Sequence, residues 1–283
     1  MLLLGIDTTT RVGSVGVVRA PIVAPAHEAP SSAIRSDVAG RCEVLADVVR
    51  HAGLEHGSAL LASIDESLAT AGVALEEVAA IAVASGPGSF TGLRVALATA
   101  KGLALGSTVA LVGVPTLEAL ACTLLPGWLE PGLAQEIPPG TLVAACLDAR
   151  KGEVYGAIFA VRAEEHGSSC VLERLTPDRA LRKHAFRETL AALLARGEAG
   201  ARALLIGDGA ERHRAQIVDA LEGRAVALPF ARYHPRGAAV ARVGAALLAA
   251  NGPDDRAELV PHYARASEAE IARARSADEG PSR

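Results

Sequence analysis

The sequence predicts an α/β fold of two lobes that share one internal plan. Residues 2–6 form an apolar run that ends in Asp7 and is followed by a threonine turn and a second β-rich run. Residues 142–147 form another apolar run that ends in Asp148, again followed by a short turn and a strand-like run. The two aspartates are 148 − 7 = 141 residues apart in a chain of 283, which is close to the size of one domain. We therefore expect a duplicated lobe.

Composition narrows the class of protein. Apolar residues make up 50% of the chain and aromatic residues only 3%, which excludes intrinsic disorder and predicts a closely packed core of Ala, Val and Leu. The formal net charge of −4 disfavours a protein that holds nucleic acid without a partner. With no basic leader and no apolar run of about 18 residues, we expect a cytoplasmic protein without a membrane span.

The first half should contain these elements in order. Residues 2–6 and 14–18 form a hairpin, and the proline-rich residues 20–40 form an inserted surface loop. Residues 42–49 fit either a helix or a strand, and their periodicity leaves the choice open. Residues 58–71 have apolar side chains at helical spacing and predict an amphipathic helix.

A glycine-rich turn at 86–92 then joins a buried strand at 79–84 to a helix at 93–105. This helix has only Arg94 and Lys101 as charged residues, so it must be covered on more than one side. We place the boundary between the lobes at residues 114 and 115.

The second lobe, residues 115–283, should repeat the plan. Its expected elements are strands at 142–147 and 154–159, a helix at 178–196, a strand at 203–206, a helix at 238–250 that could cross back to the first lobe, and a frayed tail after about 267. The four cysteines, Cys42, Cys122, Cys146 and Cys170, form no C-x-x-C pair and are expected to be buried, reduced thiols.

Three segments could line a nucleotide cleft between the lobes. An aspartate at a strand end beside threonines, as in Asp7-Thr8-Thr9, can hold magnesium through water while the turn meets phosphate. An ordinary hairpin turn is the alternative. The duplicate turn after Asp148 carries Arg150 and Lys151, which compromises such a cleft. Gly207-Asp208-Gly209 could approach a nucleotide or could simply join a strand to a helix.

No motif for catalysis is present. The histidines form no H-x-x-x-H or H-E-x-x-H pair, and no G-x-S-x-G elbow occurs. We therefore assign no catalytic residue and no metal ligand. A basic row in the helix expected at 178–196 could meet RNA phosphate within a larger assembly, or it could be a solvated helix face; it consists of Arg179, Arg182, Lys183 and Arg187.

The most distinctive segment resembles the TsaB family, the glycoprotease-like bacterial dimerisation subunits of tRNA threonylcarbamoyladenosine synthesis. The matching residues are Ser85-Gly86-Pro87-Gly88-Ser89-Phe90-Thr91-Gly92-Leu93-Arg94, Lys101-Gly102-Leu103-Ala104 and Gly113-Val114-Pro115-Thr116-Leu117. Ile6-Asp7-Thr8, Glu55-His56 and Asp148-Ala149-Arg150-Lys151-Gly152-Glu153-Val154-Tyr155 support them, and Pro261-His262-Tyr263-Ala264-Arg265 matches more weakly. The resemblance covers residues 1 to about 265. It implies a duplicated two-lobed actin-like, Hsp70-like (ASKHA) fold and favours a strand at 42–49.

The resemblance also implies a function. Such a subunit is non-catalytic and pairs with its catalytic paralogue TsaD, which transfers the threonylcarbamoyl group to the tRNA adenosine next to the anticodon. It works with the ATPase TsaE, forms a homodimer when alone, and meets tRNA only through the complex. ATP or ADP with magnesium could bind at the complex interface. An ATP-dependent phosphotransferase or ATPase that uses Asp7 is the alternative, because the shared fold permits it.

In this family the two helices beside the glycine-rich turn form a bundle with the partner. The residues expected at that interface are Leu60, Ile64, Leu68, Ser89, Phe90, Thr91, Leu93, Leu97, Ala98, Ala100 and Lys101. Two departures from the family pattern, Leu54 before Glu-His and the loop at 20–40, leave the central motif intact.

Overall fold

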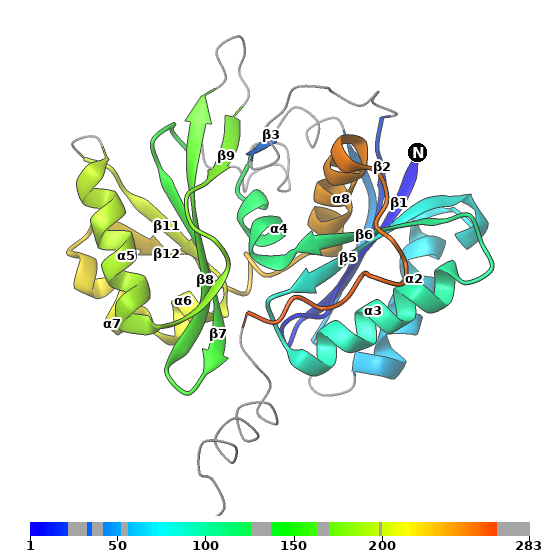
Figure 1. Ribbon diagram of the computed structural model, residues 1–283, viewed down its shortest axis with the longest axis horizontal. Helices are drawn as coiled ribbons and strands as arrows, with labels where there is room; N and C mark the ends of the chain where they lie inside the picture. Colours follow the sequence, from blue (N-terminus) through cyan, green and yellow to red (C-terminus); the bar gives the residue numbers. More distant parts are fainter. Residues whose placement is uncertain are drawn as a thin grey trace, which may run out of the picture.

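A computed structural model shows two mixed α/β lobes side by side (Figure 1). It describes residues 1–21, 33–35, 42–51, 56–125, 137–163, 170–197 and 200–264, with only the backbone described at 33–35 and 56–58. Most of the expected loop at 20–40, the Glu55 match and the expected tail lie outside these residues. No helix within the described ranges is long and apolar enough to cross a membrane.

The first sheet has the strand order β4-β2-β1-β5-β6. Its strands are β1 (Leu2–Asp7), β2 (Gly13–Arg19), β4 (Glu43–Arg50), β5 (Val78–Gly86) and β6 (Ala110–Pro115). β2 runs antiparallel to both β1 and β4, whereas β1, β5 and β6 are parallel. The segment whose periodicity fitted either a helix or a strand is therefore a strand, as the resemblance favoured.

The second sheet has seven described strands, five of which repeat this order as β9-β8-β7-β11-β12. These five are β7 (Leu142–Arg150), β8 (Glu153–Ala163), β9 (Cys170–Arg174), β11 (Ala203–Ile206) and β12 (Ala225–Ala227). The antiparallel and parallel pairings occur at the same places as in the first sheet. Asp7 and Asp148 lie near the end of the first strand of each sheet, paired with Ser14 and Val154. The predicted duplication is confirmed.

Helices cover both faces of each sheet. α2 (His56–Ala71) and α3 (Phe90–Ala104) cover the outer face of the first sheet, and α5 (Lys183–Arg196) with α7 (Arg214–Ile217) covers the outer face of the second. Two further helices, α4 (Thr116–Cys122) and α8 (Gly237–Asn251), lie between the sheets (Figure 1). Although it comes late in the chain, α8 packs against β1, β2 and β5. The remaining short helices are η1 (Leu75–Glu77), α6 (Asp208–Arg212) and η2 (Asp219–Leu221).

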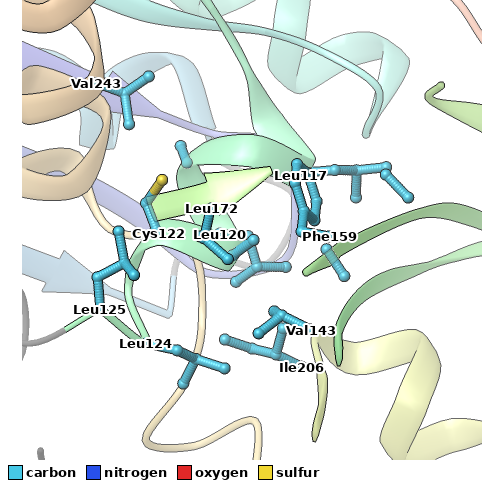
Figure 2. Packing of buried hydrophobic residues seen from close by; sticks show 14 of the residues in the cluster. Leu117, Leu120, Cys122, Leu124, Leu125, Val143, Phe159, Leu172, Ile206 and Val243 are labelled. Carbon is cyan, nitrogen blue, oxygen red and sulfur yellow. The ribbon is translucent and has the colours of Figure 1, made fainter. Parts of the chain in front are cut away.

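One hydrophobic cluster joins the two lobes, beside the clusters that lie within each lobe. Figure 2 shows Leu117 and Leu120 of α4 packed with Phe159 of β8, and Val243 of α8 belongs to the same cluster. Ala82 of β5 contributes from the first sheet. Because burying this apolar surface needs elements of both lobes, their association is part of folding.

Two predicted elements differ in the structure. The short strand β3 (Ala33–Arg35) pairs with β9, so part of the expected surface loop extends the second sheet. The expected helix at 178–196 begins only at Lys183, because β10 (Arg179–Arg182) pairs with β8. Backbone pairing with β8 thus outweighs the local helical pattern. The predicted basic row therefore does not lie along one helix.

The cysteines form no disulfide. Cys42, Cys122 and Cys146 are buried and Cys170 is half-buried. Burial raises the pKa of the Cys122 and Cys146 thiols well above the ordinary value. Thiols of this kind stay protonated and behave as small apolar side chains.

Candidate functional site

The first-lobe turn that follows β1 is closed on itself. Asp7 is fully buried, and its Oδ1 accepts hydrogen bonds from the Thr9 backbone N–H at 2.9 Å and the Thr9 hydroxyl at 2.7 Å. The Thr8 hydroxyl donates to the Gly92 carbonyl at 2.7 Å, and the Thr10 hydroxyl donates to the Val12 carbonyl at 3.1 Å. The side-chain hydroxyls of the three threonines therefore donate their protons within the protein.

The second carboxylate oxygen of Asp7 has no hydrogen-bond partner among the described residues. Burial raises the pKa of Asp7 to about 6 from 3.8, although the two bonds from Thr9 oppose the rise. The carboxyl group therefore takes up a proton more readily in the folded protein than in the unfolded chain.

Asp7→Asn should make the protein more stable above pH 6. Because the folded-state pKa is the higher one, the folded state binds more protons between about pH 4 and pH 6, and wild-type stability falls as pH rises through that window. A shift of about two pKa units corresponds to about 3 kcal/mol. Urea unfolding at pH 4, 5, 6 and 7.5 measures the free energy of unfolding of both proteins. The difference between Asp7→Asn and the wild type should grow in favour of the variant by about that amount from the lowest to the highest pH. A difference independent of pH contradicts this account of Asp7.

The glycine-rich turn packs directly on the first-lobe turn. The Ser89 backbone N–H donates to the Thr9 carbonyl at 2.7 Å. A Cβ added at Gly88 would lie 2.5 Å from the Thr9 side chain, and one added at Gly92 would lie 1.9 Å from the Thr8 carbonyl oxygen. The glycines thus allow the first turn of α3 to contact the first-lobe turn, while the Ser89 side chain caps α3.

The equivalent turn of the second lobe carries charge. The Asp148 backbone N–H donates to Asp208 Oδ1 at 2.9 Å, Arg212 lies 3.4 Å from Asp148 Oδ2, and His213 Nε2 lies 3.4 Å from Asp148 Oδ1. Burial raises the pKa of Asp208, although its hydrogen bond to Asp148 and the positive charge of Arg11 oppose the rise. Arg11 belongs to the first lobe, so charges from both lobes meet here. Within the described residues, no group of His, Cys, Asp and Glu could hold a metal ion.

The outer face of α2 and α3 is exposed and rich in small and apolar side chains. On α2 it presents Leu61, 52% exposed, with Ala62, Asp65 and Ala69. On α3 it presents Thr91, Arg94, Ala98, Gly102 and, just beyond the helix, Leu105, 84% exposed. We call this set of residues the helix-pair face. Small side chains of this kind let another helix approach closely, and an exposed apolar patch marks an interaction site.

Residues 252–264, the C-terminal strap, cross this lobe beside α3 (Figure 1). At the end of α3 the guanidinium of Arg256 donates to the Ala104 carbonyl at 2.7 Å. Asp254 Oδ2 accepts a hydrogen bond from the Gly113 backbone N–H at 2.6 Å. The strap therefore holds the C-terminal end of α3 against the sheet.

The strap also reaches the start of α3. Tyr263 stacks on Phe90 with ring centroids 5.0 Å apart, and Arg94 Nε donates to the Tyr263 hydroxyl at 3.1 Å. The Arg94 guanidinium lies 4.0 Å from the centre of the Phe90 ring. Phe90 and Tyr263 are 40% and 38% exposed, so this cluster extends the helix-pair face.

Comparisons with known proteins identify the family. The family model described as TsaD, tRNA N6-adenosine threonylcarbamoyltransferase, matches residues 48–273. Bacillus subtilis (strain 168) tRNA threonylcarbamoyladenosine biosynthesis protein TsaB is 28% identical over 80% of this chain and 87% of that protein. The Escherichia coli (strain K12) TsaB is 38% identical over 40% of this chain and 44% of that protein. The chain belongs to the TsaB family, which is related to TsaD.

A solved TsaB-like structure shows the same fold. YeaZ from Pseudomonas aeruginosa superposes with a TM-score of 0.63 at 24% identity, covering 93% of this chain and 99% of that one. The two-lobed α/β fold with a duplicated sheet, which the sequence predicted, is therefore shared with this structure. The match to the Escherichia coli protein spans 44% of its length and the match to Haemophilus influenzae TsaB spans 38%.

In this TsaB-family chain two of the three candidate cleft segments are closed by the protein's own contacts. Asp7, Thr8 and Thr9 are at most 3% exposed. A Cβ at Gly207 would lie 2.3 Å from the Cys146 carbonyl oxygen, and one at Gly209 would lie 2.7 Å from the Leu147 backbone. These glycines let α6 pack on β7, so their backbone atoms contact β7 within the second lobe. We derive no step through ATP or magnesium at these turns.

The predicted interface residues fall into two groups. Ser89, Phe90, Thr91, Ala98 and Lys101 are exposed or half-exposed, whereas Leu60, Ile64, Leu68, Leu93, Leu97 and Ala100 are buried in the first lobe. The second group packs against the first sheet, so we expect the exposed side of α2 and α3, rather than these side chains, to supply the contact. Sequence reasoning did not select three further exposed side chains of this surface, Leu61, Leu105 and Tyr263, and only Tyr263 lay in a matching motif.

Proposed function

We propose that this chain is a non-catalytic pairing subunit. It pairs with the TsaD of the same cell, and the pair adds the threonylcarbamoyl group to the tRNA adenosine next to the anticodon. Family membership supports the pathway, because the relatives are named for threonylcarbamoyladenosine biosynthesis. The helix-pair face carries the pairing part of the proposal, since its exposed apolar side chains lie on two adjacent helices.

The charges of the helix-pair face favour an antiparallel partner of the same fold. α2 presents the acidic Asp65, whereas α3 presents the basic Arg94 and Lys101. In a two-fold arrangement α2 of one subunit faces α3 of the other, so opposite charges meet. In the cell the related protein TsaD binds the helix-pair face, and a second copy of this chain binds there when TsaD is absent.

Further partners follow from the same proposal. TsaE acts as the ATPase of the assembly, and any ATP or ADP with magnesium belongs to the interface of the complex. The buried first-lobe turn supports this placement, because its hydroxyls already donate to Asp7, Gly92 and Val12. tRNA is then bound by the assembled complex and not by this subunit alone.

Size-exclusion chromatography with light scattering tests the pairing. We expect a homodimer for the chain alone and a heterodimer when TsaD is added in equal amount. A chain that stays monomeric in both samples contradicts the proposal. Magnesium-dependent ATP turnover by the chain alone, lost in Asp7→Ala, would instead support an ATPase or phosphotransferase.

A further inference from the structure

Four basic residues gather at one edge of the second lobe. Arg150 and Lys151 form the turn between β7 and β8, and Arg182 and Lys183 lie where β10 meets α5. Arg182 pairs with Glu153 in the β8–β10 ladder, and the Lys183 backbone N–H donates to the carbonyl of the turn residue Gly152. We call these four residues the basic edge.

The basic edge is open to solvent. Arg150, Lys151 and Arg182 are exposed and Lys183 is half-exposed. Two acidic residues lie beside the basic edge. Glu153 is 3.6 Å from Arg182, whose side chain is 73% exposed, and the largely buried Asp148 accepts a hydrogen bond from the Arg150 backbone N–H at 3.1 Å. Positive charge therefore predominates on this surface although the whole chain has a net charge of −4.

The backbone at this turn disfavours the residues it carries. Arg150 and Lys151 have φ of 63° and 51°, in the left-handed region where asparagine and glycine are favoured. Each long side chain costs about 1–2 kcal/mol in that conformation. The equivalent first-lobe turn carries buried threonines instead. Stability alone would therefore select other residues here, which points to a role outside folding.

We propose that the basic edge binds the phosphate backbone of RNA in the assembled complex. Arg and Lys side chains on a convex turn can each contact a phosphate without reading sequence. None of the four residues is aromatic, so the edge provides no platform on which a base could stack. The inference rests on the proposed function, because a chain with a net charge of −4 holds RNA weakly unless a partner adds contacts.

The turn variant, Arg150→Asn with Lys151→Gly, gives the sharpest test. It removes two positive charges and relieves the left-handed strain, so we expect its thermal midpoint to rise by a few degrees while RNA binding weakens. The matched control removes two exposed charges at sheet edges, Arg19→Gln with Arg162→Gln. A third variant, Arg182→Gln with Lys183→Gln, neutralises the edge without altering the turn.

Binding is measured by fluorescence anisotropy of labelled tRNA with the chain mixed with TsaD, between 50 and 200 mM salt. We expect the slope of log K against log salt to shrink by about 0.7–0.9 for each lost phosphate contact in both edge variants. The control variant should keep the wild-type slope. Equal slopes in all four proteins, or equal weakening in control and edge variants, overturn the inference.

Light scattering on the same mixtures separates this inference from the proposed function. A heterodimer with an unchanged salt slope overturns the basic edge alone. If no heterodimer forms, the chain alone is titrated with the same RNA at 20 mM salt. Weaker binding by the two edge variants than by the control then supports the basic edge, and equal binding overturns it.

Discussion

Replacing Ala98 with arginine is expected to abolish pairing while leaving the fold intact. Ala98 lies exposed at the middle of the helix-pair face, where a small side chain permits close approach of a partner helix. An arginine there would hold the helices apart or bury an unpaired charge, which costs about 3–5 kcal/mol. Such a cost weakens pairing by at least about 100-fold. Light scattering across a concentration series measures the change.

Two further variants serve as controls for this prediction. Ala192→Arg on α5 introduces the same side chain at an exposed position of the other lobe and should leave pairing unchanged. Ala100→Arg should unfold the protein, because Ala100 is fully buried against the sheet. Circular dichroism separates these two effects. Normal pairing by folded Ala98→Arg would show that the partner binds elsewhere.

Gly16→Ala should destabilise the protein severely. A Cβ at Gly16 would lie 2.2 Å from the Ala238 backbone nitrogen and 2.6 Å from its Cα. These are backbone atoms of α8, so the clash is relieved only if the helix moves off β1 and β2. We expect a loss of at least about 3 kcal/mol in the free energy of unfolding, because overpacking against backbone cannot be absorbed by a rotamer change.

Gly13→Ala on the same strand provides the control. The nearest atom to a Cβ at Gly13 is 3.8 Å away, an ordinary contact, so a change below about 1 kcal/mol is expected. Urea unfolding compares the two variants. Equal losses would show that the close approach of α8 to Gly16 does not determine stability.

The duplicated plan was predictable because the first strand of each sheet is encoded by the same sequence pattern. An apolar run ending in aspartate, a turn and a β-rich run recur around Asp7 and Asp148, and both become the first two strands of equivalent sheets. The β4 segment was not decided by its own residues, because half-exposed edge strands mix polar and apolar side chains at either period. β10 was missed because only its pairing with β8 fixes it as a strand.

The predicted interface residues lie partly on the exposed side of α2 and α3 and partly on the side that packs on the sheet. Leu60, Ile64 and Leu68 recur at helical spacing, but such a stripe marks the side that packs on the sheet. The opposite side of α2, which includes Leu61, is the side open to solvent. Tyr263 reaches Phe90 across 173 residues of sequence, and no local pattern reports a contact of that range.

The sequence does not show whether the hydrogen-bonding groups of the first-lobe turn are open to a nucleotide. Asp7 and its threonines have the chemistry of a magnesium and phosphate site, but their hydrogen bonds are made within the protein. Burial of the turn beneath the start of α3 follows from the close fit of Gly88 and Gly92, which are 81 and 85 residues further along the chain than Asp7.

The most direct test of the central claim is a threonylcarbamoyl-transfer assay on tRNA with TsaD alone, this chain alone, and the two mixed, with TsaE and ATP present throughout. We expect transfer only in the mixture, with activity rising to a plateau at equal amounts of the two proteins and absent with Ala98→Arg. Transfer by the chain alone, or full transfer by TsaD without it, would contradict a non-catalytic pairing subunit.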